Sequence, residues 1–323
     1  MRGSPIMIGL GAGATSALLY AAAASGSPLA LLLLYAAPLP ILIAAAGWRH
    51  LAGLVATVFG AACLALVVGP KTALYFTIAV GLPSWWLAYL ALLARPGDAP
   101  GAVEWYPPGR LVIWCAALGA LLVAASIPLV ATSLEEYRAA LRELFTKAFE
   151  ARSDAPGMVP GDEAKPLIEL MTALAPSMAA GFWTASSLFN LWLAGRIVRA
   201  SGRLARPWPD LRRITFPNKA FLGLLGGFAG SLLPDLAGLV AELFAGTFLM
   251  AFALLGLAVV HVMTQATPAR GLILFAIYAM LVLQPWILLF LAGLGVAEQI
   301  FGVRRRFGPP PGGPPATATA PLP

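Results

Sequence analysis

Apolar residues run along the chain in long stretches, separated by short segments that hold most of its prolines and charges. Each stretch is about 18 to 25 residues long, and a helix of about 20 apolar residues crosses the hydrocarbon core of a bilayer. The stretches predict spans over residues 1–27, 28–47, 51–68, 72–94, 111–130, 166–203, 220–234, 239–262 and 271–300. We therefore expect an all-α fold: a polytopic helical transmembrane bundle of about eight to ten spans.

A different pattern occupies residues 133–152, where apolar residues fall on one helical face and charged residues on the other. This spacing predicts an external amphipathic helix. Ser133 is placed to cap it with Glu136, and Glu143 and Lys147 are placed to form an ion pair. The helix is expected either to lie flat on the outer leaflet or to cover an outward-facing cavity as a lid.

The domain organisation follows from these segments. Residues 1–306 are expected to form a single integral membrane domain, and residues 307–323 a disordered tail rich in Pro and Ala. Within the domain, the segments are spans one to five (1–132), the external amphipathic helix and loop (133–165), the sixth span with a basic cytoplasmic loop (166–219) and the C-terminal spans (220–306).

Composition excludes a soluble globular chain. Hydrophobic residues make up 60% and charged residues 11%, whereas about a quarter of the residues of a soluble domain are charged. The net charge of +7 lies in short loops that flank spans, so it indicates orientation in a membrane and not a nucleic-acid partner. Cys63 and Cys115 lie inside apolar stretches, which indicates small buried side chains and neither a disulfide nor a metal site. We expect no metal and no cofactor.

The strongest orientation signal lies between residues 196 and 219, where seven basic residues accompany one acid, Asp210. The positive-inside rule places this loop and the N-terminus in the cytoplasm, and the acidic segment 133–169 outside. Six arginines of the loop are candidates for contact with anionic lipid or a partner: Arg196, Arg199, Arg203, Arg206, Arg212 and Arg213.

The C-terminal end conflicts with a simple count of spans. Nine spans from a cytoplasmic N-terminus would leave Arg304, Arg305 and Arg306 outside, against the positive-inside rule. Either 271–300 is a hairpin broken at Pro285, or 220–234 is re-entrant, or the rule fails at this end. We expect a cytoplasmic C-terminus.

A candidate ligand cavity is suggested by residues that interrupt or punctuate the spans. Pro38 and Pro40 each remove a backbone donor, and the freed carbonyls need neighbouring protein or a water-filled cavity. Asn190 lies deep enough to need a partner, either another helix or a substrate. Trp85 and Trp86 suit an aromatic belt or the lining of an apolar pocket. The candidate cavity residues are Pro38, Pro40, Trp85, Trp86 and Asn190.

Small residues recur every fourth position along the first span, at Gly9, Gly13, Ala17 and Ala21. Such a face allows another helix to approach closely, either within this chain or from a partner subunit. If it docks a partner, leucine at Gly9 and Gly13 should abolish the association and leave the fold intact. The stretch also resembles a signal peptide, but further spans follow at once, and we expect it to be retained.

Several segments together, MIGLGAGATSALLYAAA, YAAPLPILIA, EWYPPGRLVIW, FNLWLAGRI and GLAVVH, resemble the uncharacterised YybS-like family of bacterial integral membrane proteins, in particular its alphaproteobacterial branch. The resemblance runs from Met7 to about Arg306 and implies an inner-membrane location. A more remote similarity, to the S-components of energy-coupling-factor transporters, implies that the small-residue face contacts a scaffold subunit. Those proteins have six helices, and this chain continues beyond Arg213.

Catalytic motifs are missing from the sequence: it has no HExxH, no CxxC and no phosphate-binding glycine loop, so we expect a chain that is not an enzyme. The leading hypothesis is a transport-related membrane subunit that binds a small solute and works with membrane or ATPase partner subunits. The alternative is a structural or assembly protein whose basic cytoplasmic loop binds anionic lipid or a partner protein.

Overall fold

The computed structural model describes residues 4–97, 102–151, 164–284 and 286–306. The chain forms two compact units, which are treated separately below. The first comprises Met1–Pro209 and Phe216–Ala251, and the second Asp210–Thr215 and Phe252–Pro323.

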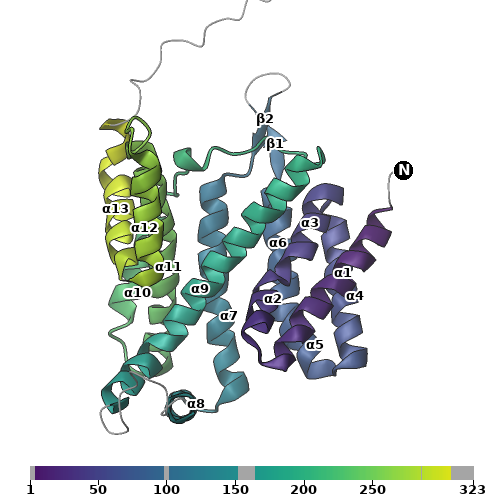
Figure 1. Cartoon of the computed structure of the whole chain (residues 1–323), viewed down its shortest axis with the longest axis vertical. Coiled ribbons are helices and arrows are strands. Elements are labelled where there is room, and N and C mark those ends of the chain that lie inside the picture. Colours follow the sequence, from purple (N-terminus) through teal and green to yellow (C-terminus); the bar gives the residue numbers. More distant parts are fainter. Residues whose placement is uncertain (1–3, 98–101, 152–163, 285, 307–323) are drawn as a thin grey trace, which may run out of the picture. The chain divides into compact units, whose positions relative to one another are not determined.

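Helices dominate the first unit (Figure 1). Its α-helices are α1 (Pro5–Ala21), α2 (Pro28–Ala36), α3 (Pro38–Trp48), α4 (His50–Val67), α5 (Pro70–Phe76), α6 (Leu82–Ala91), α7 (Pro108–Val130), α8 (Leu134–Glu150), α9 (Lys165–Ala200), α10 (Ala220–Gly230) and the first part of α11 (Asp235–Met263). Shorter elements are the 3₁₀ turn η1 (Ala22–Ser25), the π-helical turn η2 (Thr77–Gly81) and the antiparallel strands β1 (Ala94–Pro96) and β2 (Val103–Trp105). The predicted all-α class is confirmed.

Six helical segments of the described chain are long and apolar enough to cross a membrane: Pro5–Ser25, Leu29–Trp48, His50–Val67, Pro70–Ala91, Pro108–Val130 and Asp235–Met263. They agree with six of the predicted spans. Helix α9 is 36 residues long and runs obliquely through the unit (Figure 1). Shorter apolar helices occupy the remaining predicted spans. The total of eight to ten crossings stays a prediction.

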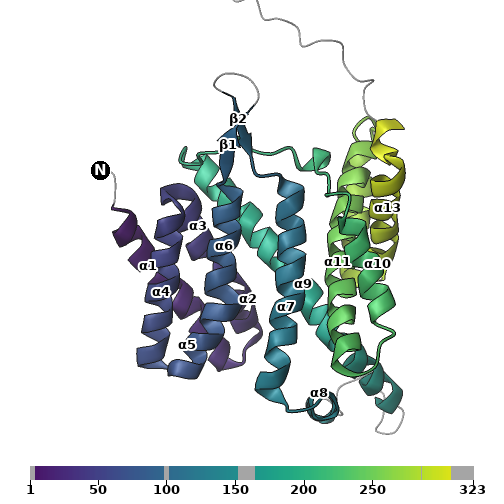
Figure 2. The same cartoon turned by 180° about the vertical axis from the view of Figure 1, so that it is seen from behind.

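The loops of the first unit gather by side (Figure 2). The one-residue connection at Arg49, the β1–β2 pair and the chain after α9 lie at one end, where the Arg203 guanidinium is 4.6 Å from the Trp48 ring. Arg206 reaches the carbonyl of Ala91 at 2.9 Å. We call this the basic end and define it by Arg49, Arg95, Arg196, Arg199, Arg203 and Arg206. Loops that the charge pattern predicts on one side of the membrane thus lie together.

Helix α8 lies at the opposite end and has the predicted amphipathic form (Figure 2). Ser133 accepts a hydrogen bond from the amide of Glu136, and Glu143 pairs with Lys147 at 2.6 Å, as the spacing predicted. Its apolar face packs through Tyr137, which is buried in a cluster with Ile127, Ala131 and Leu239. Its polar face bonds α9 through Arg142 and Glu169.

The second unit contains η4 (Leu211–Arg213), the rest of α11, α12 (Arg270–Leu283), α13 (Ile287–Phe301) and η5 (Val303–Arg306). Gly256 faces the carbonyl of Leu291, and Gly295 faces the carbonyl of Phe252. The two helices α11 and α13 therefore pack closely at these glycines, and α12 and α13 lie side by side (Figure 1). The predicted interruption of 271–300 is therefore a helical hairpin; Pro285 itself lies outside the described residues.

The hairpin brings the C-terminal arginines to the loop after α9. Arg304 donates hydrogen bonds to the carbonyls of Arg212 and Ile214, the latter at 2.8 Å. Its guanidinium also pairs with Glu298 at 2.9 Å, and the two side chains are only 12% and 11% exposed. Arg304 thus lies against residues 212–214 of the basic loop, as a cytoplasmic position for both would require; the side of the membrane stays a prediction.

Candidate functional site

A kink between α2 and α3 is present, as Pro38 and Pro40 predict. Polar side chains of the same unit donate hydrogen bonds to backbone carbonyls at this kink. Asn190 on α9 donates its amide hydrogens to the carbonyls of Tyr35, at 2.8 Å, and Ser186, at 2.9 Å. Ser16 on α1 donates to the carbonyl of Ala37 at 2.6 Å. Carbonyls at a broken turn need such partners because lipid offers none. Of the two roles considered for Asn190, the structure shows contact between helices.

The π-helical turn η2 is a second interruption, and its backbone carbonyls also accept hydrogen bonds from side chains. Thr57 on α4 donates its hydroxyl to the carbonyl of Gly81 at 3.1 Å. The indole of Trp183 on α9 donates to the carbonyl of Ala79, also at 3.1 Å. The turn lies inside the predicted span 72–94 and was not expected from the sequence.

The remaining predicted cavity residues lie in different surroundings. Trp85 and Trp86 belong to a ring cluster on α6, with Tyr89 at centroid distances of 6.0 and 5.7 Å. Pro38 is the first residue of α3, and Pro40 lines the groove described below. The five residues thus divide among a bonded kink, an aromatic cluster and a groove.

The small-residue face of α1 packs on α4 of the same chain. Gly9, Gly13 and Ala17 are buried, and Ala21 is partly buried. A Cβ at Gly9 would lie 2.7 Å from the carbonyl oxygen of Ala52. A Cβ at Gly13 would collide with the carbonyl of Ala56. Leucine at Gly9 and Gly13 would therefore disturb the fold, contrary to the expectation that it would remove only a partner.

At the basic end, arginines lie over the faces of tryptophans. Arg196 lies 5.8 Å from the ring of Trp192, and Arg199 lies 5.5 Å from that of Trp208. Arg203, which is exposed, lies over Trp48. Tryptophan rings prefer the headgroup level of a bilayer, and cation–π contacts hold the guanidinium groups at that level. The arrangement is a cationic surface backed by tryptophan rings.

Arg206 differs from the other arginines of the basic end because it is half-buried. Its guanidinium donates to the carbonyls of Ala91, at 2.9 Å, and Tyr106, at 3.4 Å, and lies over the ring of Trp105. Burial lowers the pKa of this guanidinium below its usual value. Its Nε has no hydrogen-bond partner among the described residues. Arg206 ties the loop after α9 to the β1–β2 pair, so its role is structural.

The last two candidate arginines belong to the second unit and share one carboxylate. Arg212 bonds Asp210 at 2.9 Å, and Arg213 lies 3.6 Å from it. The hydrogen bond from the Arg212 side chain, with further contributions from Arg212 and Arg213, lowers the pKa of Asp210. These two charges are thus partly neutralised, unlike those of Arg196, Arg199 and Arg203.

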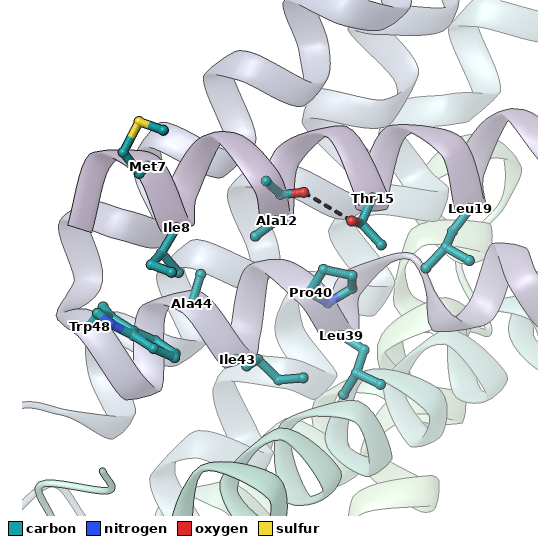
Figure 3. A pocket seen from close by; sticks show the side chains of 11 residues that line it. Met7, Ile8, Ala12, Thr15, Leu19, Leu39, Pro40, Ile43, Ala44 and Trp48 are labelled. Atoms are coloured by element: carbon teal, nitrogen blue, oxygen red, sulfur yellow. Dashed lines mark hydrogen bonds between the residues drawn. The ribbon is translucent and has the colours of Figure 1, made fainter. Parts of the chain in front are cut away.

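An open apolar groove of about 590 Å³ runs between α1 and α3 (Figure 3). Met7, Ile8 and Trp48 lie at one end, and Leu19 and Leu39 at the other. Trp48 is also the ring beneath Arg203, so this end of the groove opens at the basic end.

A family model described as "Predicted membrane protein (DUF2232)" matches residues 14–298. The chain belongs to this family. Comparison with curated proteins and with solved structures finds no match. The match supports the expected multi-pass membrane protein of an uncharacterised family. It does not test the more specific likenesses to YybS-like proteins and to S-components.

The groove between α1 and α3 was not expected from the sequence. Gly11 and Thr15 lie on α1 two positions from the packed glycines, with the same spacing of four. That spacing was a usable signal for a second helix face. Nothing in the sequence, however, indicated that α3 would lie beside this face and leave a groove.

Proposed function

We propose that the chain is a non-enzymatic, multi-pass protein of the bacterial inner membrane that binds anionic phospholipid headgroups through its basic end. In this proposal its N-terminus lies in the cytoplasm. The proposed binding of anionic headgroups rests on three arginines, Arg196, Arg199 and Arg203. These guanidiniums lie over tryptophan rings, and no carboxylate of the described chain pairs with them.

Magnitudes favour lipid as the partner. Each basic residue near an anionic leaflet contributes about 1 kcal/mol, so three together give a substantial preference for that surface. A guanidinium also bonds a phosphate through two parallel donors. Nucleic acid is not proposed, because the same charges already follow from orientation in the membrane.

A transport-related membrane subunit that binds a small solute, with a membrane or ATPase partner, stays our second proposal. The two interrupted spans favour it, since interrupted helices form the binding sites of many transporters. However, the kink carbonyls of Tyr35 and Ala37 already have donors within the chain, and Gly9 and Gly13 already have a helix against them. A YybS-like, alphaproteobacterial affiliation is likewise proposed from the sequence likeness alone.

The test is lipid retention measured by native mass spectrometry. The protein is exchanged into detergent with equal amounts of phosphatidylglycerol and phosphatidylcholine. We expect preferential retention of phosphatidylglycerol, and loss of that preference in a triple variant with Arg196→Gln, Arg199→Gln and Arg203→Gln. The matched control removes three cations away from the basic end, with Lys71→Gln, Arg138→Gln and Lys147→Gln.

Two results would refute the proposal. One is equal retention of the two lipids by the unmodified protein. The other is an equal loss of preference in both triple variants, which would indicate net charge and not the basic end.

A further inference from the structure

We propose that the groove between α1 and α3 holds one acyl chain of an anionic phospholipid whose headgroup lies at Arg203. This inference rests on the proposed function and deepens it. The proposed function concerns headgroups at a charged surface, whereas this inference assigns a site for a whole lipid, with a defined place for its chain.

The lining of the groove suits a hydrocarbon chain. Its side chains are apolar apart from Thr15, whose hydroxyl donates to the carbonyl of Gly11 at 2.9 Å (Figure 3). The Thr15 hydroxyl is therefore already paired. Trp48 Nε1 is a buried donor without a hydrogen-bond partner among the described residues, and it belongs to the ring that lies beneath Arg203. The rest of the lining is apolar and suits an acyl chain. The volume of about 590 Å³ lies within the range of about 300–1,000 Å³ usual for ligand sites.

The length of the groove matches one leaflet. Met7 and Leu19 mark its extent on α1, and twelve helical steps of about 1.5 Å make roughly 18 Å. Half of the hydrocarbon core of a bilayer is about 15 Å. A chain anchored at the headgroup level would therefore fill the groove to about the middle of the bilayer.

Charge at the mouth of the groove selects the headgroup. Trp48 lines the groove, and its ring lies 4.6 Å from the Arg203 guanidinium. Arg49, the next residue in the chain, is also exposed. Two cations at the mouth and an apolar channel behind it match an anionic phospholipid. An apolar helix of a second copy or a partner would gain nothing from the charges.

Gly11 makes the inference testable. A Cβ added there meets no atom within 4 Å, so leucine at this position enters the groove without disturbing the packing of α1. Gly226 on α10 is a matched control: it is an exposed helical glycine whose added Cβ also meets nothing within 4 Å, and it does not line the groove.

The experiment uses the full chain in nanodiscs of phosphatidylcholine with a small fraction of phosphatidylglycerol that carries a diazirine on one acyl chain. After photolysis, cross-linked residues are mapped by peptide mass spectrometry. We expect labelling concentrated on Met7–Leu19 and Leu39–Trp48. It should fall about tenfold in Gly11→Leu, because losing the burial of two methylenes is enough for that change. Gly226→Leu should label like the unmodified protein.

Further arms separate the two proposals. In Arg203→Gln, groove labelling by the phosphatidylglycerol probe should fall to that of a phosphatidylcholine probe with the same diazirine. If phosphatidylglycerol is retained selectively but labels the whole perimeter evenly in every variant, the groove inference fails and the proposed function stands. Loss of selectivity itself would overturn both. A groove that neither lipid probe labels would indicate that a protein segment covers it, and this result would overturn the inference.

Discussion

Asn190 illustrates how single polar residues act inside this apolar chain. Its amide joins α9 to the broken turn of α2, and a side chain that sequence reasoning offered to a substrate is occupied by backbone. Arg206 is similar: it lies in the basic loop, but it bonds carbonyls of neighbouring elements. At the residue scale, burial and bonding thus divide polar side chains into those that hold the fold and those, such as Arg203, that remain accessible.

Replacing Asn190 with leucine tests this division. The change leaves the part-buried carbonyl of Tyr35 without its side-chain amide donor, and we expect a loss of about 1–2 kcal/mol in the free energy of unfolding. Unfolding by increasing mole fraction of SDS in mild detergent measures it. Ser231→Ala, which removes a hydroxyl bonded only within its own turn, should change stability little. Equal stability of the two variants would contradict the assignment.

At the scale of elements, helix packing depends on where small residues lie. The α1–α4 pair is one close contact of this kind, since Gly9 and Gly13 leave no space for a side chain. The same helix carries Gly11 on its open side. One helix thus presents one face to the core and another to the groove.

Gly13→Leu should therefore prevent α1 from packing, whereas Gly11→Leu should not. The added side chain at position 13 meets the backbone of α4, which cannot move aside as a flexible side chain could. We expect aggregation or a loss of several kcal/mol for Gly13→Leu, and an unchanged elution profile for Gly11→Leu. Gel filtration of the detergent-solubilised variants distinguishes them. A monodisperse Gly13→Leu protein would show that α1 is not held by this contact.

Helix α8 should loosen in acid. The hydrogen bond from the Thr132 side chain lowers the pKa of Glu136, and that from Lys147 lowers the pKa of Glu143. Stabilisation from a carboxyl with a lowered pKa is complete above its ordinary value of 4.5, and it is lost as the pH falls through the lower folded-state pKa. Amide protection factors in α8, corrected for intrinsic exchange, should therefore fall below pH 4.5.

The control for this pH dependence is Glu136→Gln with Glu143→Gln. Without the two carboxylates, the loss of protection in α8 should be smaller; Glu169, whose pKa is lowered by its hydrogen bond from Arg142, still contributes. An acid transition of the same size in the double variant would assign the effect to other groups.

For the whole molecule, orientation follows from where the charges gather. In the first unit the basic end collects loops from distant parts of the sequence, and in the second unit the helical hairpin returns Arg304 to the loop residues Arg212 and Ile214. Both arrangements agree with the positive-inside rule. The rule concerns short loops. Within each unit, contacts between residues far apart in the chain hold such loops together.

Residues 213 and 306 should therefore be accessible from the same side of the membrane. Single-cysteine variants Arg213→Cys and Arg306→Cys, in a background where Cys63 and Cys115 are replaced by alanine, can be labelled in sealed vesicles of known orientation with a membrane-impermeant maleimide. We expect both to react from the cytoplasmic side and Thr146→Cys on α8 to react from the other. Reaction of positions 213 and 306 from opposite sides would exclude the hairpin.

The sequence by itself determined the fold class, the positions of the main spans, the amphipathic helix with its Ser133 cap, and the family resemblance to membrane proteins. It could do so because these features are local: apolar length, helical periodicity and capping chemistry depend on residues within about one helix. The kink at Pro38 and the interruption of 271–300 followed for the same reason, since proline removes a donor wherever it stands.

Only the tertiary structure decided which partners these elements have. Whether Asn190 bonds a ligand or Tyr35, whether Gly13 receives a partner subunit or α4, and whether the arginine triplet lies near Arg212 all depend on contacts between residues far apart in the chain. Small residues and isolated amides favour close approach by any helix, so the sequence leaves that helix unspecified. The groove exists only because α3 lies beside the open face of α1.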